Sequence, residues 1–395
     1  MKYPKIYLTL DNCFAIKRWT KPSEWMPLIK KIGFQSVQAS FDNEIDFLYS
    51  PEWYLEQWFS EVERVERETG IRVDTFFTGY QTYRTAGLAH ADREMADYLK
   101  REWMEKAVRW LGKRQSHMGV SFFAMTDEVL QNPERYSKVY NEVIERFADI
   151  AKCAAENKIY FCSEAMYAPH QPSWTIKGTK KFLKDCYAKN GNPIYTTVDV
   201  GHMVGQRRFR RPSRHQIEES IETARPEMVR PGFWIGAEHT VELWKQAVEE
   251  KAGRERLIEE IMEDINRYEY LFSDGEEDSS PYAWLEELAC YSPILHMQQT
   301  NGVASSHAAF TEKTNKDGII KGKELLQAIA KSYEKETEEG MPPKVDKIYL
   351  AFEIFGANAE YSYEIVDKLT ETAKYWKTFV PEDGIVLDKL LEKLN

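Results

Sequence analysis

Short apolar segments of β-strand composition alternate along this chain with longer charged segments of helical period, and this alternation restricts the possible folds more than any other feature of the sequence. Repeated strand–helix units form parallel sheets whose strands are covered by the connecting helices. The eight strands that we predict span residues 6–10, 36–40, 73–77, 120–124, 159–163, 195–199, 294–298 and 348–352.

Eight parallel strands close most economically into a barrel, because closure leaves no edge strand unpaired. An open doubly wound sheet is the alternative fold for the same alternation. No glycine-rich GxGxxG turn follows the first predicted strand, so a dinucleotide-binding crevice is not indicated. We therefore predict an α/β protein with a single (β/α)₈ TIM-barrel domain over residues 1–395. Its predicted outer helices include residues 51–69, 92–114, 133–157 and 178–189.

One connection in this pattern is unusually long. About 95 residues separate the sixth predicted strand from the seventh, where a strand–helix unit normally needs a few tens. We predict an inserted helical segment over residues 204–280, with one or two long charged helices in 241–272 and an exposed acidic loop in 273–280. Such an insertion would lie over the carboxyl ends of the strands as a lid, or would form a subunit contact.

Four predicted strands end in side chains that bind metal ions, and in a barrel these strand ends meet at one opening. The four residues are Glu164, Asp199, His296 and Glu353. Taken singly, each acid is more simply explained as a solvated or salt-bridged residue. Together, three carboxylates would repel one another and lose hydration unless a cation lay between them. One imidazole with three carboxylates suits Mn²⁺, Mg²⁺ or Co²⁺ better than a structural zinc, and leaves positions open for substrate oxygens.

These strand ends resemble those of the xylose-isomerase-like barrel superfamily, in particular its sugar epimerases related to D-tagatose and D-psicose 3-epimerase. The resemblance rests on the two glutamates, the Asp-Val-Gly-His sequence at residues 199–202 and the histidine of the seventh strand. It extends over the whole barrel and includes the Leu-Ala-His-Ala-Asp-Arg sequence at residues 88–93, before the third helix.

The resemblance implies one divalent metal ion held by these four residues, and no organic cofactor. Mn²⁺ is the ion that we expect, with Mg²⁺, Co²⁺ and Zn²⁺ as alternatives. The implied substrate is a small keto sugar or sugar phosphate, isomerised or epimerised through a metal-stabilised cis-enediolate. Glu164 and Glu353 would then be the catalytic pair, one removing a proton and the other returning one.

Two histidines near these strand ends are candidates for substrate binding. His202 lies three residues after Asp199 and is expected to bind a substrate hydroxyl rather than the metal, with a structural role as the alternative. His170 lies six residues after Glu164, where the epimerases commonly carry a second substrate-binding acid. This departure makes the substrate of those enzymes an uncertain guide to the substrate of this chain.

Two further segments could contact the distal part of a substrate. Ser305 and His307 lie after the seventh strand, where related enzymes often carry an arginine; they would bind a hydroxyl or a phosphate, or belong to an ordinary polar loop. Residues 207–214 form the one concentrated basic run of the chain, with Arg207 as the candidate for binding a substrate phosphate or carboxylate. Alternatively, these arginines pair with the acidic insertion.

Composition limits the possible partners. The formal net charge of −11 argues against a nucleic-acid partner. Five scattered cysteines without CxxC pairs indicate neither a disulfide framework nor a cysteine zinc site. The sequence shows no signal peptide and no apolar run of transmembrane length, so we expect a cytoplasmic protein without a membrane partner. The insertion and the resemblance together favour a homo-oligomer, a dimer or a tetramer.

Other activities of the superfamily need separate consideration. Its metal-dependent endonucleases for abasic DNA carry additional histidines at earlier strand ends, whereas no histidine directly follows the third predicted strand here. A lyase or dehydratase acting on a keto sugar or keto-inositol stays open, because the same enediolate can eliminate a leaving group instead of being reprotonated. A sugar-binding scaffold without catalysis would lack one of the four ligands, and none is missing.

Overall fold

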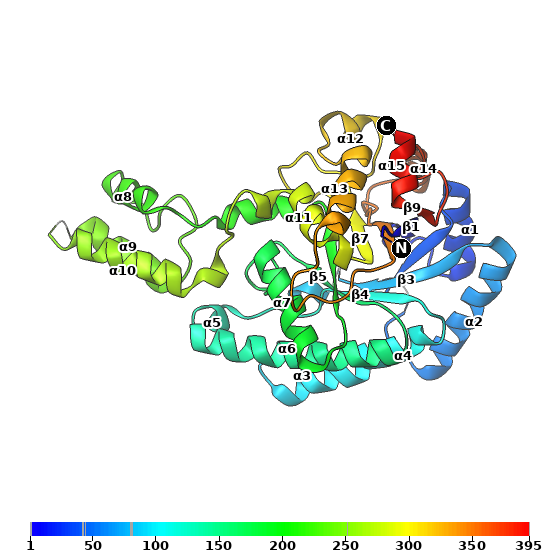
Figure 1. Cartoon of the computed structure of the whole chain (residues 1–395), viewed down its shortest axis with the longest axis horizontal. Helices are drawn as coiled ribbons and strands as arrows, with labels where there is room; N and C mark the ends of the chain where they lie inside the picture. The colour runs from blue at the N-terminus through cyan, green and yellow to red at the C-terminus, as the bar shows by residue number, and fades with distance from the viewer. Residues whose placement is uncertain (1, 42, 44, 80–81, 251, 395) are drawn as a thin grey trace.

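Eight parallel strands form a closed barrel in the computed structural model, which describes residues 2–41, 43, 45–79, 82–250 and 252–394 (Figure 1). Neighbouring strands follow the chain order from β2 to β8, then β1, and a further β1–β2 pairing closes the ring. The strands are β1 (Lys5–Asp11), β2 (Ser36–Ser40), β3 (Arg72–Thr78), β4 (His117–Val120), β5 (Phe161–Ala165), β6 (Tyr195–Asp199), β7 (Ile294–Met297) and β8 (Lys347–Phe352). The predicted (β/α)₈ barrel is confirmed.

Helices surround this barrel, and a short strand β9 (Ile385–Val386) pairs antiparallel with β1. The helices of the barrel are α1 (Pro22–Ile32), α2 (Glu52–Thr69), α3 (Arg93–Leu99), α4 (Lys106–Gly112), α5 (Asp127–Leu130), α6 (Pro133–Glu156), α7 (Ile176–Asn190), α11 (Pro281–Leu288), α12 (Glu312–Asp317), α13 (Gly322–Glu334), α14 (Ser362–Lys377) and α15 (Leu387–Leu394). The predicted third helix is divided, because a π-helical segment, Lys100–Glu105, joins α3 to α4.

Two predicted strands are displaced from their observed positions. The fourth was predicted at 120–124 but ends at Val120, because the apolar residues that follow leave the sheet and pack beneath the helices, where Phe122 and Phe123 are buried. The fifth was predicted at 159–163 but begins at Phe161. Lys158 has a φ of +59°, and the turn that ends α6 continues through Ile159, whose N–H donates to the carbonyl of Ala154.

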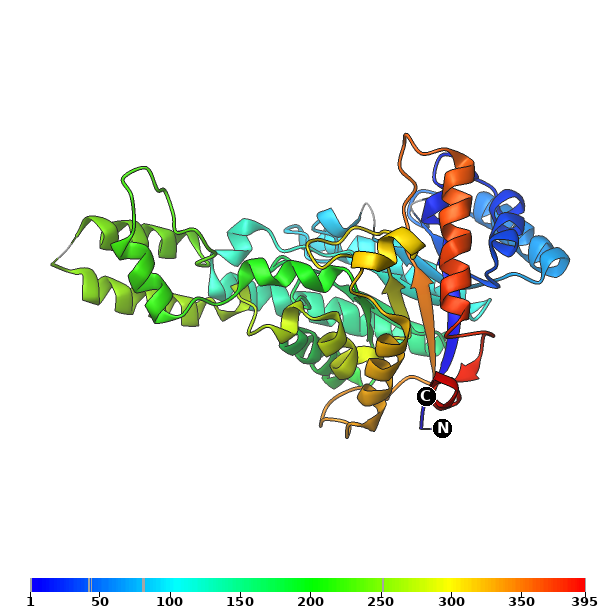
Figure 2. The ribbon, with the colours of Figure 1, turned by 90° about the horizontal axis from the view of Figure 1, so that it is seen from above.

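The long connection between β6 and β7 contains a helical arm formed by α8 (Arg214–Glu222), α9 (Glu238–Glu249) and α10 (Arg254–Arg267). Figure 2 shows this arm extending to the side of the barrel. The arm has an apolar interior of its own, which includes the buried Trp244 and Ile261. Residues 273–280 were predicted as an exposed loop, but Ser273 and Asp278 are buried. The roles of lid or subunit contact stay predictions.

Two predictions from composition can be compared with the described residues. All five cysteines are buried and none forms a disulfide. Within the described ranges, no helix combines the length and the apolar character that crossing a membrane requires. The cytoplasmic location and the oligomeric state stay predictions.

Candidate metal centre

The four predicted ligands meet at the carboxyl ends of four consecutive strands. Glu164 belongs to β5, Asp199 ends β6, His296 belongs to β7 and Glu353 follows β8. One ligand atom from each lies within 4.8 Å of the corresponding atoms of the other three, and all four residues are buried. Parallel pairing at successive strand ends therefore places three carboxylates and one imidazole around a common point.

The imidazole of His296 lies between two of the carboxylates. Its Nδ1 lies 2.9 Å from Oε1 of Glu164 and 3.3 Å from Oε2 of Glu353. On the other side of the ring, Nε2 lies 3.0 Å from the side-chain nitrogen of Gln38, which also contacts Asp11. The contact between Nε2 and the Gln38 side chain fixes the orientation of the ring, as is usual for a metal-binding histidine.

The electrostatics of the cluster match a cation site. Although burial disfavours its charged form, Glu353 and Glu164 raise the pKa of His296 well above its usual value. Burial also lowers the pKa of His202, but the neighbouring carboxylates of Asp199 and Glu164 outweigh this effect and raise the pKa above its usual value. The buried carboxylates thus attract positive charge, and a divalent ion supplies the charge that protons would otherwise bring. The residues present therefore fit a metal ion.

The Asp-Val-Gly-His turn after β6 holds Asp199 in place. Oδ1 of Asp199 accepts hydrogen bonds from the backbone N–H groups of Gly201 at 2.6 Å and His202 at 3.2 Å. A side chain at position 201 is excluded, because an added Cβ would lie 2.2 Å from Cδ of Gln298. Gln298 can then approach Asp199, with its amide nitrogen 2.8 and 3.0 Å from the two carboxylate oxygens.

Gln298 also holds the loop after β7, a role that the sequence analysis did not identify. Its Oε1 accepts hydrogen bonds from the backbone N–H groups of Ser306 at 2.9 Å and His307 at 2.6 Å. His307 has a φ of +44°, a left-handed conformation that a histidine adopts only when its surroundings impose it. The side chain of His307 is thereby fixed beside Glu353, with Nδ1 3.4 Å from Oε2.

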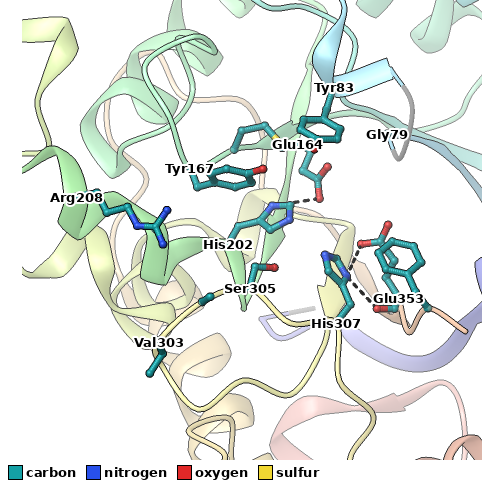
Figure 3. Close-up of a pocket in the computed structure, with 14 residues that line it drawn as sticks. Gly79, Tyr83, Glu164, Tyr167, His202, Arg208, Val303, Ser305, His307 and Glu353 are labelled. Atoms are coloured by element: carbon teal, nitrogen blue, oxygen red, sulfur yellow. Dashed lines mark hydrogen bonds and ion pairs between the residues drawn. The ribbon is translucent and has the colours of Figure 1, made fainter. Parts of the chain in front are cut away.

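A cavity of about 350 Å³ opens onto this cluster (Figure 3). Its lining includes Glu164 and Glu353 together with the predicted substrate-binding residues His202, Ser305 and His307. His202 lies at the inner end, with Nε2 3.6 Å from Asp199 and Nδ1 3.8 Å from Glu164. The remaining walls are largely aromatic and apolar, and they are formed by Gly79, Tyr83, Met166, Tyr167, Gly205, Arg208, Val303, Ala304 and Phe355.

Two predicted substrate-binding residues lie outside the lining of this cavity. His170 lines a neighbouring depression, where its Nδ1 lies 2.8 Å from the carbonyl oxygen of Met125. Arg207 turns toward the loop after β7 and donates hydrogen bonds to the carbonyls of Gly302, at 2.8 Å, and Val303. Arg207 thus holds the loop, while the next residue, Arg208, faces the cavity instead.

Two other arginines of the basic run pair with acidic residues, as the alternative interpretation expected. Arg210 forms an ion pair with Glu276 at 3.1 Å. Arg214 pairs with Glu259 of the arm at 2.6 Å, and also with Glu255. These arginines therefore connect segments of the insertion to one another.

Known proteins resemble this chain over nearly its whole length. No protein-family model matches the chain. A curated relative, D-erythrulose 1-phosphate 3-epimerase from Brucella abortus, is 19% identical over 376 residues, which cover 93% of this chain and 94% of the relative. Both chains thus align over nearly their whole length.

Solved structures show the same fold. A candidate xylose isomerase from Rhodospirillum rubrum superposes with a TM-score of 0.65 at 15% identity, covering 94% of this chain and 99% of its own. D-psicose 3-epimerase from Clostridium cellulolyticum, solved with D-tagatose, gives 0.52 at 11% identity, covering 95% and 98%. A xylose-isomerase-like TIM-barrel protein from Mycobacterium smegmatis, solved with magnesium, gives 0.52 at 12% identity, covering 98% of both chains. The chain has the fold of the xylose-isomerase-like barrels.

Proposed function

We propose that this chain is a divalent-metal-dependent isomerase or epimerase of a small keto sugar or its phosphate ester. The observation that carries the proposal is the convergence of Glu164, Asp199, His296 and Glu353 within 4.8 Å beneath a cavity of sugar size. The similarity to an epimerase over nearly the whole chain supports the same class of activity. We propose Mn²⁺ as the native ion, and the magnesium-containing neighbour supports a divalent ion of this kind.

The chemistry requires a proton to leave the carbon next to a carbonyl and a proton to return. A divalent ion on the four ligands would polarise the carbonyl and make that proton more acidic. Glu164 and Glu353 reach the cavity from strands three places apart, with His296 between them, so they would flank the substrate. In the proposed reaction one carboxylate takes the proton as the C–H bond breaks. The other delivers a proton to the opposite face of the same carbon, or to its neighbour, as a new C–H bond forms.

The histidines supply orientation in this proposal. His202 and His307 line the cavity next to each other, with ring centroids 5.7 Å apart, and are directed toward carboxylates, which favours their N–H groups as donors. Donors in these positions would bind substrate hydroxyls and hold the reacting carbon between the two glutamates. Ser305 adds a hydroxyl to the same wall.

Solvent exchange tests the proposal. Metal-loaded protein is incubated in D₂O with a panel of ketoses of four to six carbons and their phosphate esters. We expect deuterium at a carbon next to the carbonyl, with a changed stereocentre or a shifted carbonyl. Glu164→Gln and Glu353→Gln should abolish this exchange, and Glu68→Gln, at an exposed i,i+4 ion pair of α2, is the matched control.

Three outcomes would contradict the proposal. Exchange that survives either glutamine substitution at a near-normal rate would exclude the two-carboxylate mechanism. Full activity after complete removal of divalent ions would exclude the metal. A product lacking one molecule of water would assign the chain to the dehydratases instead.

A further inference from the structure

A row of three residues runs along one side of the cavity, from the metal ligands toward the opening. The segment after β6 is a 3₁₀ helix, η4 (His202–Phe209), which has three residues per turn. Residues spaced by three therefore share one face, and His202, Gly205 and Arg208 all line the cavity. With a rise of about 2 Å per residue, the backbone of Arg208 lies about 12 Å along the helix axis from that of His202.

Gly205 keeps the middle of this row open. An added Cβ at this position would lie 2.9 Å from Cβ of Tyr167, so any larger residue would collide with the aromatic wall. The row thus places an imidazole beside the metal ligands, a clear stretch in the middle and a guanidinium at the far end. Figure 3 shows the Arg208 side chain directed toward the cavity on the side of Tyr167.

Arg208 differs from the other arginines of its run in having no partner. Arg207 binds backbone carbonyls, and Arg210 and Arg214 form ion pairs. Arg211 donates to Asn266. Within the described part of the chain, Arg208 makes no hydrogen bond and no ion pair, and it is the sole lysine or arginine lining the cavity. An unpaired guanidinium in such a position is available to a ligand.

We propose that Arg208 binds the phosphate group of a phosphorylated keto sugar whose carbonyl end lies at the metal ligands. This inference rests on the proposed function and specifies its substrate class. The planar guanidinium presents paired N–H donors that match phosphate oxygens. Because Arg208 is exposed at the opening, the phosphate keeps part of its hydration and the cost of burying its charge stays low. In the proposed function the carbonyl end of the sugar occupies the metal ligands at the inner end of the cavity, so the phosphate is directed to the outer end, where Arg208 lies.

Binding of a substrate-like compound that cannot react tests this inference directly. Erythritol 4-phosphate carries the phosphate but has no carbonyl, so it does not turn over, and its affinity for the metal-loaded protein is measured by titration calorimetry. We expect Arg208→Gln to weaken this binding about tenfold to a hundredfold, the usual range for a charged hydrogen-bonded contact. Arg210→Gln, in the same run but paired with Glu276, is the matched control and should bind within twofold of the unchanged protein.

Two outcomes would overturn the inference. Equal affinity of the unchanged protein and Arg208→Gln would show that the guanidinium does not hold the phosphate. Tighter binding of erythronate, which carries a carboxylate, than of erythritol 4-phosphate, together with loss of this preference in Arg208→Gln, would assign Arg208 to sugar acids.

The inference and the proposed function fail separately. Arg208-dependent phosphate binding without any deuterium exchange would retain the binding site and reject the isomerase. The opposite failure has two signs. The protein would catalyse deuterium exchange with an unphosphorylated ketose, and Arg208→Gln would not change its preference between that ketose and the phosphate ester. This result would retain the isomerase and reject the phosphate site.

Discussion

Replacing Glu164 by Gln should change metal affinity and metal-free stability in opposite directions. Glu164, Asp199 and Glu353 present ligand atoms within 4.8 Å of one another. Each such pair of carboxylates repels by about 3.5 kcal/mol at an effective dielectric constant of about 20. The substitution removes two of the three repulsive pairs, about 7 kcal/mol of repulsion in the metal-free protein, and it also removes the attraction of a divalent cation to Glu164, about 7 kcal/mol at the same separation.

The lost attraction to the cation sets the expected loss of affinity. A change of about 7 kcal/mol corresponds to about five powers of ten in a dissociation constant. Screening by water and the proton on His296 reduce the effect, so we expect the dissociation constant for Mn²⁺ to rise at least about a thousandfold. Titration calorimetry at several pH values measures this constant and also the protons released from His296 when the metal binds.

The metal-free protein should respond differently. Glu164→Gln also removes the attraction between Oε1 of Glu164 and the protonated His296 at 2.9 Å, about 6 kcal/mol on the same scale. Above the pH at which His202 loses its proton, the difference leaves the chelator-treated variant more stable than the unchanged chain by about 1 kcal/mol. While His202 is protonated, the variant also loses the attraction between Glu164 and His202 at 3.8 Å, about 4 kcal/mol, and should be the less stable of the two.

Thermal unfolding with Mn²⁺ and with chelator measures both effects, and Glu68→Gln is the control at an exposed ion pair. The reasoning is refuted if Glu164→Gln lowers the melting temperature in chelator and keeps the full stabilisation by Mn²⁺. Such a result would mean that neither the repulsion between Glu164 and its neighbouring carboxylates nor its attraction to the cation has the expected size.

Three other substitutions have expected outcomes. Gln298→Leu leaves Asp199 and two loop N–H groups without their hydrogen-bond partner. The free energy of unfolding measured in urea should therefore fall by about 3 kcal/mol or more, and Mn²⁺ affinity should fall about tenfold to a hundredfold. Arg207→Gln frees the loop after β7, and we expect faster amide hydrogen exchange in residues 301–307 and about tenfold lower kcat/KM, with unchanged exchange in the arm. Burial, assisted by Lys347, lowers the pKa of His117 to about 3, so below pH 6.5 the unfolded chain takes up a proton that the folded chain refuses. Stability should therefore fall by about 1.4 kcal/mol per pH unit from pH 6.5 toward pH 3, and urea unfolding of His117→Gln should show a weaker slope.

The convergence of Glu164, Asp199, His296 and Glu353 could be predicted because their chemistry is unusual at strand ends, and strand ends converge in any barrel. Errors of two to four residues in β4 and β5 did not affect this result, because Glu164 still reaches the opening from β5. The shift in β4 could not be predicted, since the apolar residues after Val120 are buried outside the sheet, and a buried loop has the composition of a strand. Gln298 was missed because its role depends on the approach that Gly201 permits.

Arg208 shows a different limit, because its position depends on the period of one short helix. An α-helix after β6 would place residues 202, 205 or 206 and 209 on one face, and would turn Phe209 toward the cavity. The 3₁₀ period places Arg208 there instead and leaves Arg207 to hold the loop after β7. One short segment therefore connects the metal ligands, the loop that carries His307 and the far end of the cavity. A change of period in this segment would move all three together, so substrate orientation in this protein should depend on η4 as much as on the barrel strands.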